Sequence, residues 1–226
     1  MHFEFESPLH RVKQLILQGE NQHLDFKFNI SNSRKIAKTL VAFANTQGGR
    51  LLIGVKDNGQ IAGVRSDEEY YMIEAAATMY TKPEVKFETQ EWEVDDRMVL
   101  EVYIAESDKK PHYAMDEKGK WLAYIRFEDN NLLANRIWLE TIRRKRQEKQ
   151  TVIKYSEEEN LLLAYLLEHK KITLGEFGTL TRISKRKAEN ILINLAAIGI
   201  IEIHITTDET YFTQGHPQTE GQDQIR

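Results

Sequence analysis

The sequence predicts an α+β fold in two parts. Apolar residues recur at helical spacing in some segments and alternate with polar residues in others, so helices and strands are interspersed. Asn58-Gly59 lies between two apolar runs, which is the strongest short signal for a hairpin, and hairpins make a sheet at least partly antiparallel. A charged run before residue 150, which has no apolar face, separates this mixed region from a second one.

In the first part, helices and strands follow one another in mixed order. Residues 23–29 alternate, with Leu24 and Phe26 on one side of a strand and Asp25 and Lys27 on the other. Asp95-Asp96 is expected to be a turn between two further strands. Helices are expected over 8–18, 33–46 and 67–80, and strands over 51–55, 61–64, 85–92, 98–104 and 121–127.

The second part has a simpler pattern. Ser156, followed by three glutamates, is typical of a helix start, because the serine caps the helix and the acids complement its dipole. Helices are expected over 157–169, 173–177 and 185–198, followed by a hairpin of 200–205 and 210–213. Three helices and a hairpin are the layout of a small winged helix-turn-helix domain.

The expected domains follow from this division. They are a mixed α/β domain over 1–135, a basic helical connector over 136–153, a winged helix-turn-helix domain over 154–213 and a disordered tail over 214–226.

Composition excludes several classes of protein. The 226 residues include no cysteine, which excludes disulfides, thiolate zinc sites and cysteine nucleophiles. No stretch approaches the ~18 consecutive apolar residues of a membrane helix, and the acidic N-terminus is unlike a signal peptide, so we expect a cytoplasmic protein with no membrane partner. The net charge of −4 argues against a protein that coats nucleic acid through bulk charge. Any phosphate-binding surface therefore has to come from local clustering.

Several motifs of the first part resemble those of the Schlafen AlbA-like domain. They are Glu20 with Asp25-Phe26-Lys27, the run 42–49 (AFANTQGG), the run 51–59 (LLIGVKDNG), 110–113 (KPHY) and 124–127 (YIRF). Their order and spacing extend the resemblance over about residues 8–148. The resemblance implies a mixed sheet with flanking helices, in proteins that often carry a helix-turn-helix module and are described as transcriptional regulators or divergent ATP-binding proteins. Asp25 departs from the family pattern, which has Glu there, and Phe127-Glu128 stands where Val-Gly is frequent.

The resemblance also implies a candidate catalytic and metal-binding site. In animal Schlafens three acids form an RNA-cleaving site around a divalent metal, and by position they correspond to Glu20, Asp25 and Asp57. Carboxylates that converge at strand ends can hold Mg²⁺ or Mn²⁺ beside a phosphate, where the metal polarises the phosphoryl oxygen and activates water. Structural roles are the alternative: Asp57 suits the turn, Glu20 a loop, and Asp25 with Lys27 an ion pair. ATP binding is not expected, because the chain has no P-loop motif.

Cationic side chains form the candidate nucleic-acid surface. Ser184 is followed by three cations that open the last helix, where side chains and free backbone N–H groups can meet phosphates or guanine edges. The residues expected to contact nucleic acid are Lys27, Arg126, Arg143, Arg144, Arg146, Lys185, Arg186 and Lys187. The alternatives are a solvated helix start, a protein-interaction module, and a buried ion pair for Arg126.

The preferred interpretation is a two-domain nucleic-acid-binding protein that regulates transcription, with DNA favoured over RNA. A metal-dependent ribonuclease using Glu20, Asp25 and Asp57, and a protein-interaction adaptor, are the alternatives, and the sequence leaves enzymatic activity open. We also expect a homodimer. Animal Schlafens resemble two lobes that face each other across a groove, whereas this chain has one, and two-fold dimers are the commonest closed assembly.

Overall fold

The chain folds into two compact units, Met1–Ala134 and Asn135–Arg226. The computed structural model describes residues 8–64, 67–146 and 155–215. Helices and sheets occur in it together, which confirms the predicted α+β class. Among the described residues, no helix is long and apolar enough to cross a membrane.

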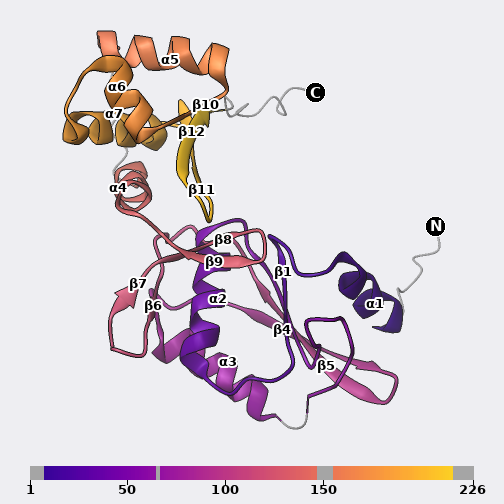
Figure 1. The fold of residues 1–226 in the computed structure, drawn as a ribbon. Coiled ribbons are helices and arrows are strands. Elements are labelled where there is room, and N and C mark those ends of the chain that lie inside the picture. The colour runs from indigo at the N-terminus through magenta and orange to yellow at the C-terminus, as the bar shows by residue number, and fades with distance from the viewer. Residues whose placement is uncertain (1–7, 65–66, 147–154, 216–226) are drawn as a thin grey trace, which may run out of the picture. The chain divides into compact units, whose positions relative to one another are not determined.

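The first unit is built on a mixed sheet in the order β1-β2-β5-β4 (Figure 1). β1 (Leu24–Lys27) runs parallel to β2 (Gly49–Ile53). β5 (Arg97–Ile104) is antiparallel to β2, and β4 (Glu88–Val94) is antiparallel to β5. The parallel pair is possible because a helix crosses over between β1 and β2, whereas the antiparallel pair β4–β5 needs only a tight turn.

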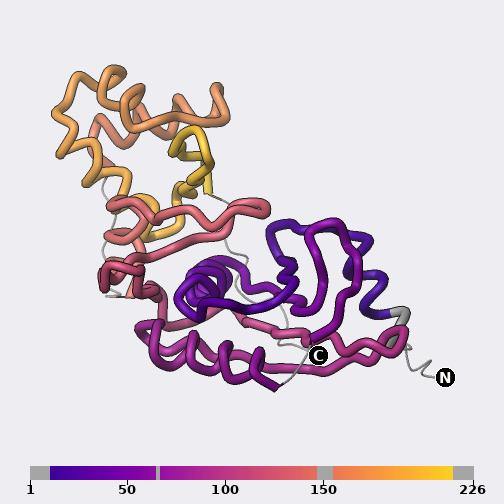
Figure 2. Tube along the Cα trace, turned by 60° about the horizontal axis from the view of Figure 1, so that its bottom comes forward, coloured from indigo at the N-terminus to yellow at the C-terminus, as the bar shows by residue number. Residues whose placement is uncertain are grey.

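Helices cover both faces of this sheet. α2 (Ser33–Asn45) and α3 (Glu68–Met79) pack side by side, as both views show (Figures 1 and 2). Leu51 and Ile53 belong to the core cluster beneath these helices, whereas Leu52 belongs to the cluster of α1 (Pro8–Gln18). Successive strand residues point to opposite faces, so α1 covers the face opposite α2. Asp25, paired with Leu51 in register, therefore points toward the α2 side.

Two small sheets complete the first unit. One has the order β3-β6-β7, formed by Thr81–Lys82, Tyr113–Met115 and Trp121–Leu122. The other pairs β8 (Tyr124–Phe127) with β9 (Asn130–Leu133). The single strand predicted over 121–127 is thus divided between two sheets, and α2 packs against β8.

Another sequence prediction was wrong in part. The turn at Asn58-Gly59 forms, but 61–64 is not a strand: only an isolated bridge joins Val55 and Ile61, and β2 pairs with β5 instead. The two glycines interrupt the ladder: Gly54 and Gly63 have φ of 92° and 80°, outside the extended region, and the N–H groups of Ala62 and Gly63 both donate to the Gly54 carbonyl oxygen. The predicted turn at Asp95-Asp96 is confirmed, with φ of 51° and 57°, as a two-residue hairpin turn requires.

The second unit contains helices and one antiparallel sheet. Its helices are α4 (Arg136–Lys145), α5 (Glu157–His169), α6 (Leu174–Thr181) and α7 (Lys185–Ala197). Its sheet has the order β10-β12-β11, formed by Lys171–Thr173, Thr210–Gln214 and Ile201–Ile205. The predicted second helix over 173–177 is longer in the structure and ends at Thr181.

Helix α4 is part of the second unit. It covers residues assigned to a connector by sequence, but it packs on α7, and Ile137 is buried in the same cluster as Leu192. The remainder of the expected connector, 147–153, lies outside the described residues, as do 216–226 of the expected tail; Gln214 ends β12.

Candidate functional site

Asp25 is the most buried of the predicted acids, with 4% of its surface exposed. Its Oδ2 lies 2.9 Å from Lys27 Nζ, and its Oδ1 accepts a hydrogen bond from Arg126 Nη2 at 3.2 Å. A carboxylate at this depth is tolerated only when it is paired and hydrogen-bonded. Both oxygens of Asp25 are therefore already engaged by cations.

Arg126 is buried, with 3% of its surface exposed. Besides Asp25, its guanidinium donates hydrogen bonds to three acceptors: Asn21 O, Leu24 O and Asn131 Oδ1. These bonds join β8 to β1 and to the segment before it. The expectation that Arg126 contacts nucleic acid is corrected here: the side chain is an internal anchor, and its charge is enclosed by its own chain.

Glu20 lies beside Asp25. Its Oε1 accepts a hydrogen bond from the backbone N–H of Phe26 at 2.9 Å and lies 3.9 Å from Lys27 Nζ. Burial raises the pKa of Glu20 above its ordinary value, and the neighbouring Asp25 raises it further, while the Phe26 N–H and Lys27 oppose this shift. The structure thus brings Glu20, Asp25 and Lys27 into one partly buried polar cluster.

Asp57 does not join that cluster. It is exposed in the turn that follows β2, beyond the strand end, while Asp25 pairs with Leu51 in the middle of the strand. In the part of the chain that the structure describes, no three His, Asp or Glu side chains are arranged to hold a metal ion. The convergence of three acids, expected from the resemblance, is therefore not found among these residues.

Three predicted cations open helix α7. Ser184 caps the helix, since its hydroxyl accepts a hydrogen bond from the Lys187 N–H. Lys187 Nζ pairs with Glu158 Oε1 at 2.6 Å, and this hydrogen bond lowers the pKa of Glu158. Lys185 and Arg186 are exposed, and within the described residues neither pairs with an acid. These two side chains are the available cations at this end of α7.

The predicted cations of α4 have different surroundings. Arg143 pairs with Glu140 one turn earlier on the same helix at 2.6 Å, and Arg146 is exposed. Arg144 instead reaches α7, where it donates hydrogen bonds to Oδ1 of Asn190 and of Asn194. Sequence reasoning missed both asparagines, although their spacing of four places them on one face of the helix.

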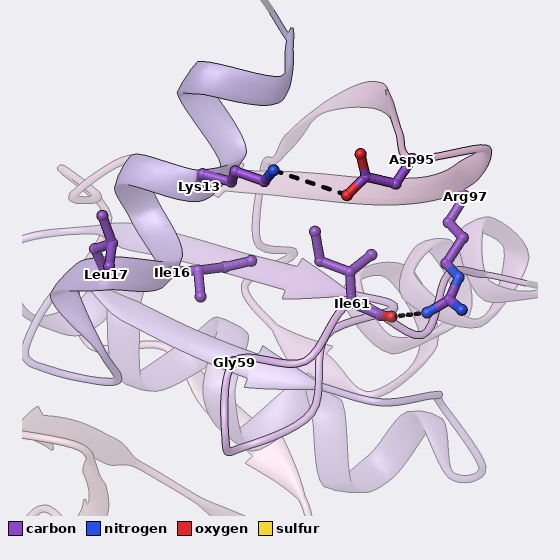
Figure 3. Close-up of a pocket in the computed structure, with 7 residues that line it drawn as sticks. All are labelled: Lys13, Ile16, Leu17, Gly59, Ile61, Asp95 and Arg97. Carbon is purple, nitrogen blue, oxygen red and sulfur yellow. Dashed lines mark hydrogen bonds and ion pairs between the residues drawn. The ribbon is translucent and has the colours of Figure 1, made fainter.

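An open cavity of about 470 Å³ lies in the first unit, beside α1 (Figure 3). It is lined by Lys13, Ile16, Leu17, Gly59, Ile61, Asp95 and Arg97. Both cations at its rim are engaged: Lys13 Nζ lies 3.8 Å from Asp95 Oδ2, and Arg97 donates a hydrogen bond to the Ile61 carbonyl oxygen. The cavity therefore has an apolar lining and a rim that carries two cations and one carboxylate.

No curated protein matches the chain. The DIP2311 protein from Corynebacterium diphtheriae is similar at 17% identity and a TM-score of 0.43, over 85% of this chain and 34% of that one. The chain thus spans about a third of the length of that protein. The N-terminal domain of a RecG-related protein from Nitrosomonas europaea is similar at 18% identity and a TM-score of 0.38, over 67% of this chain and 97% of that one.

A family model covers most of the first unit. The model described as "Schlafen, AlbA_2" matches residues 20–135, a segment that holds the Glu20, Asp25, Lys27 and Arg126 side chains discussed above. The match covers more than half of the chain, and the chain therefore belongs to the Schlafen AlbA_2 family.

Proposed function

We propose that this protein binds duplex DNA through its second unit and acts as a transcriptional regulator. The observation that carries the proposal is the start of α7, where Lys185 and Arg186 are exposed beside a capped helix terminus that follows α6 and a short turn. Two helices joined in this way, with an antiparallel sheet behind them, have the layout of a winged helix-turn-helix domain. Family membership adds support, since the resemblance to the Schlafen AlbA-like domain implies a function that involves nucleic acid.

DNA is preferred to RNA for a geometric reason. The major groove of B-form DNA is about 12 Å wide and admits a helix, whereas the major groove of an RNA duplex is deep and too narrow for side chains to read. A positively charged helix start suits the DNA groove, with its phosphate edges and guanine acceptors.

Binding to a random duplex at several salt concentrations tests this proposal. Removal of both cations (Lys185→Ala with Arg186→Ala) should weaken binding at low salt by roughly tenfold or more and reduce the salt slope by about 2. The matched control removes two exposed lysines of the first unit, Lys109 and Lys118, and should leave the affinity unchanged. No duplex binding by the wild type, or an equal loss in both variants, overturns the proposal.

The ribonuclease alternative has weaker support. A metal would have to be held by Glu20, Asp25 and Asp57, but Arg126 and Lys27 already occupy the oxygens of Asp25, and Asp57 lies apart. Incubation with tRNA and Mn²⁺ or Mg²⁺ tests it: cleavage that is lost in Asp57→Ala would restore this alternative. Binding of ATP stays unexpected, because the chain has no P-loop motif.

The homodimer also stays part of the proposal. A two-fold dimer would present two copies of Lys185 and Arg186 on one assembly and concentrate positive charge in a chain of net charge −4. Light scattering at micromolar concentration tests it, and a mass near 26.4 kDa throughout would exclude the dimer.

A further inference from the structure

Part of the face of α7 that points away from its core is covered. Helical spacing places Ala188, Leu192 and Leu195 on the core side, and all three are buried. Ile193 lies on the opposite side of the helix, yet it is only 2% exposed. Helix α4 packs on α7, and its Ile137 belongs to the same buried cluster as Ile193.

Polar contacts at the edge of this packing involve the two asparagines of α7. Arg144 donates hydrogen bonds from its two terminal nitrogens, one to Oδ1 of Asn194 and one to Oδ1 of Asn190, the latter at 3.3 Å. Arg136 pairs with Glu189 at 3.3 Å. An asparagine amide has the acceptor and donor that match the N6 and N7 positions of adenine in the major groove. Arg144 thus holds the two acceptor oxygens that would read adenine.

With α4 in place, α7 can approach a major groove with its start but is too thick to enter along its length. A helix with its side chains is about 10–12 Å across, which is close to the ~12 Å width of the groove. A second helix packed at an interaxial distance of about 8–10 Å nearly doubles that thickness. Lys185 and Arg186 are exposed at the start of α7, and Asn190 and Asn194 are exposed beside α4, where Arg144 occupies their acceptor oxygens.

One buried polar group destabilises the packing of α4. Thr141 of α4 is buried, with 6% of its surface exposed, and its hydroxyl has no hydrogen-bond partner within the described residues. A buried hydroxyl without a partner destabilises the state that buries it. The ion pair of Arg136 lies at the exposed rim, where such pairs contribute little.

We propose that α4 packs beside a base-reading face of α7 and occupies its amides through Arg144, and that release of α4 lets Asn190 and Asn194 read A·T base pairs in duplex DNA. The proposal rests on the proposed function, since it concerns the same helix. DNA binding then has two stages: the cations at the start of α7 hold phosphates while α4 is docked, and discrimination between sequences requires its release. The apparent affinity for a target is the intrinsic affinity multiplied by the fraction of molecules in which α4 is released.

Arg144→Ala tests the proposal, because the loss of its charge and the release of α4 predict opposite changes in the affinity for DNA. Loss of a cation by itself should weaken DNA binding, whereas release of α4 should tighten binding to an A·T-rich duplex by roughly tenfold. The matched control is Lys145→Ala, which removes the next cation of the same helix; that side chain is exposed. Amide hydrogen exchange should show faster exchange in α4 of Arg144→Ala, while the amides of α7 keep their protection.

Two further variants complete the test. Thr141→Val removes the unpartnered hydroxyl, holds α4 more firmly and should weaken binding to the A·T-rich duplex several-fold. Replacing Asn190 and Asn194 with alanine in the Arg144→Ala background should abolish the preference for A·T-rich over G·C-rich duplexes and leave the salt slope unchanged.

The outcomes separate the two proposals. A wild type that binds duplex through Lys185 and Arg186, with an Arg144→Ala variant that binds no tighter, overturns the role of α4 and keeps the proposed function. Faster amide exchange in α4 of Arg144→Ala without any gain in affinity for DNA also overturns the role of α4. A wild type that binds no duplex overturns the proposed function itself.

Discussion

Replacement of Arg126 by methionine is expected to destabilise the first unit severely. The change keeps the length of the side chain but removes the cation from Asp25, whose side chain is 6% exposed. It also removes the donors that serve the carbonyl oxygens of Asn21 and Leu24. Breaking a buried ion pair by deleting one partner costs about 3–5 kcal/mol, because the other charge is left uncompensated. At about 4 °C per kcal/mol for a unit of this size, the melting temperature should fall by roughly 10–20 °C.

Urea unfolding followed by tryptophan fluorescence measures this loss. The Trp138→Phe background leaves Trp92 and Trp121, which both belong to the first unit, as reporters. The control is Lys27→Met, which removes the second cation bound to Asp25. The Lys27 side chain is 35% exposed, so its loss should cost less than about 1 kcal/mol.

The free energies of unfolding of the two variants test whether the buried Arg126 stabilises the first unit. Equal destabilisation by Arg126→Met and Lys27→Met would show that the buried Arg126 stabilises the fold no more than the partly exposed Lys27 does. A double variant, Asp25→Leu with Arg126→Met, should recover part of the loss, because it leaves no unpaired charge in the interior.

Two other predictions concern pH and backbone conformation. The pKa of Glu20 is raised in the folded chain, mainly by burial, so the folded state holds this proton more tightly than the unfolded state. Its contribution to stability is present below the ordinary pKa of a glutamate and is lost as the pH rises through the raised pKa. Glu20→Gln should therefore gain stability relative to wild type across that window in unfolding measured at a series of pH values, and a difference independent of pH would contradict this. Gly48→Ala should cost about 2 kcal/mol more than Gly119→Ala in urea unfolding. Both glycines have positive φ, of 73° and 76°, but a Cβ atom on Gly48 would lie 2.6 Å from the Ile104 carbonyl oxygen, while at Gly119 nothing lies within 4 Å; equal losses would refute this account.

The sequence by itself determined the class of fold and the positions of several elements. Helix α5 has the predicted bounds 157–169, because its start is encoded locally by Ser156 and Glu159, which form a capping box. The turn at Asp95-Asp96 was predictable for the same reason, since turn residues act on their own backbone. Periodicity and capping are properties of neighbouring residues, and they can be recognised without knowledge of the partner elements.

Tertiary structure alone decided the environment of the charged residues. Arg126 follows Asp25 by 101 positions, so nothing in the local pattern indicates whether its guanidinium faces solvent or a buried carboxylate. The same holds for Arg144, which sequence reasoning grouped with Arg143 and Arg146 but which lies on Asn190 and Asn194. A charge has a different effect when it is desolvated and paired than when it is exposed, and that difference is set by segments far apart in the chain. For this protein the sequence therefore determined where the cations and acids stand along the chain, and packing between distant segments determined which of them are available to a ligand.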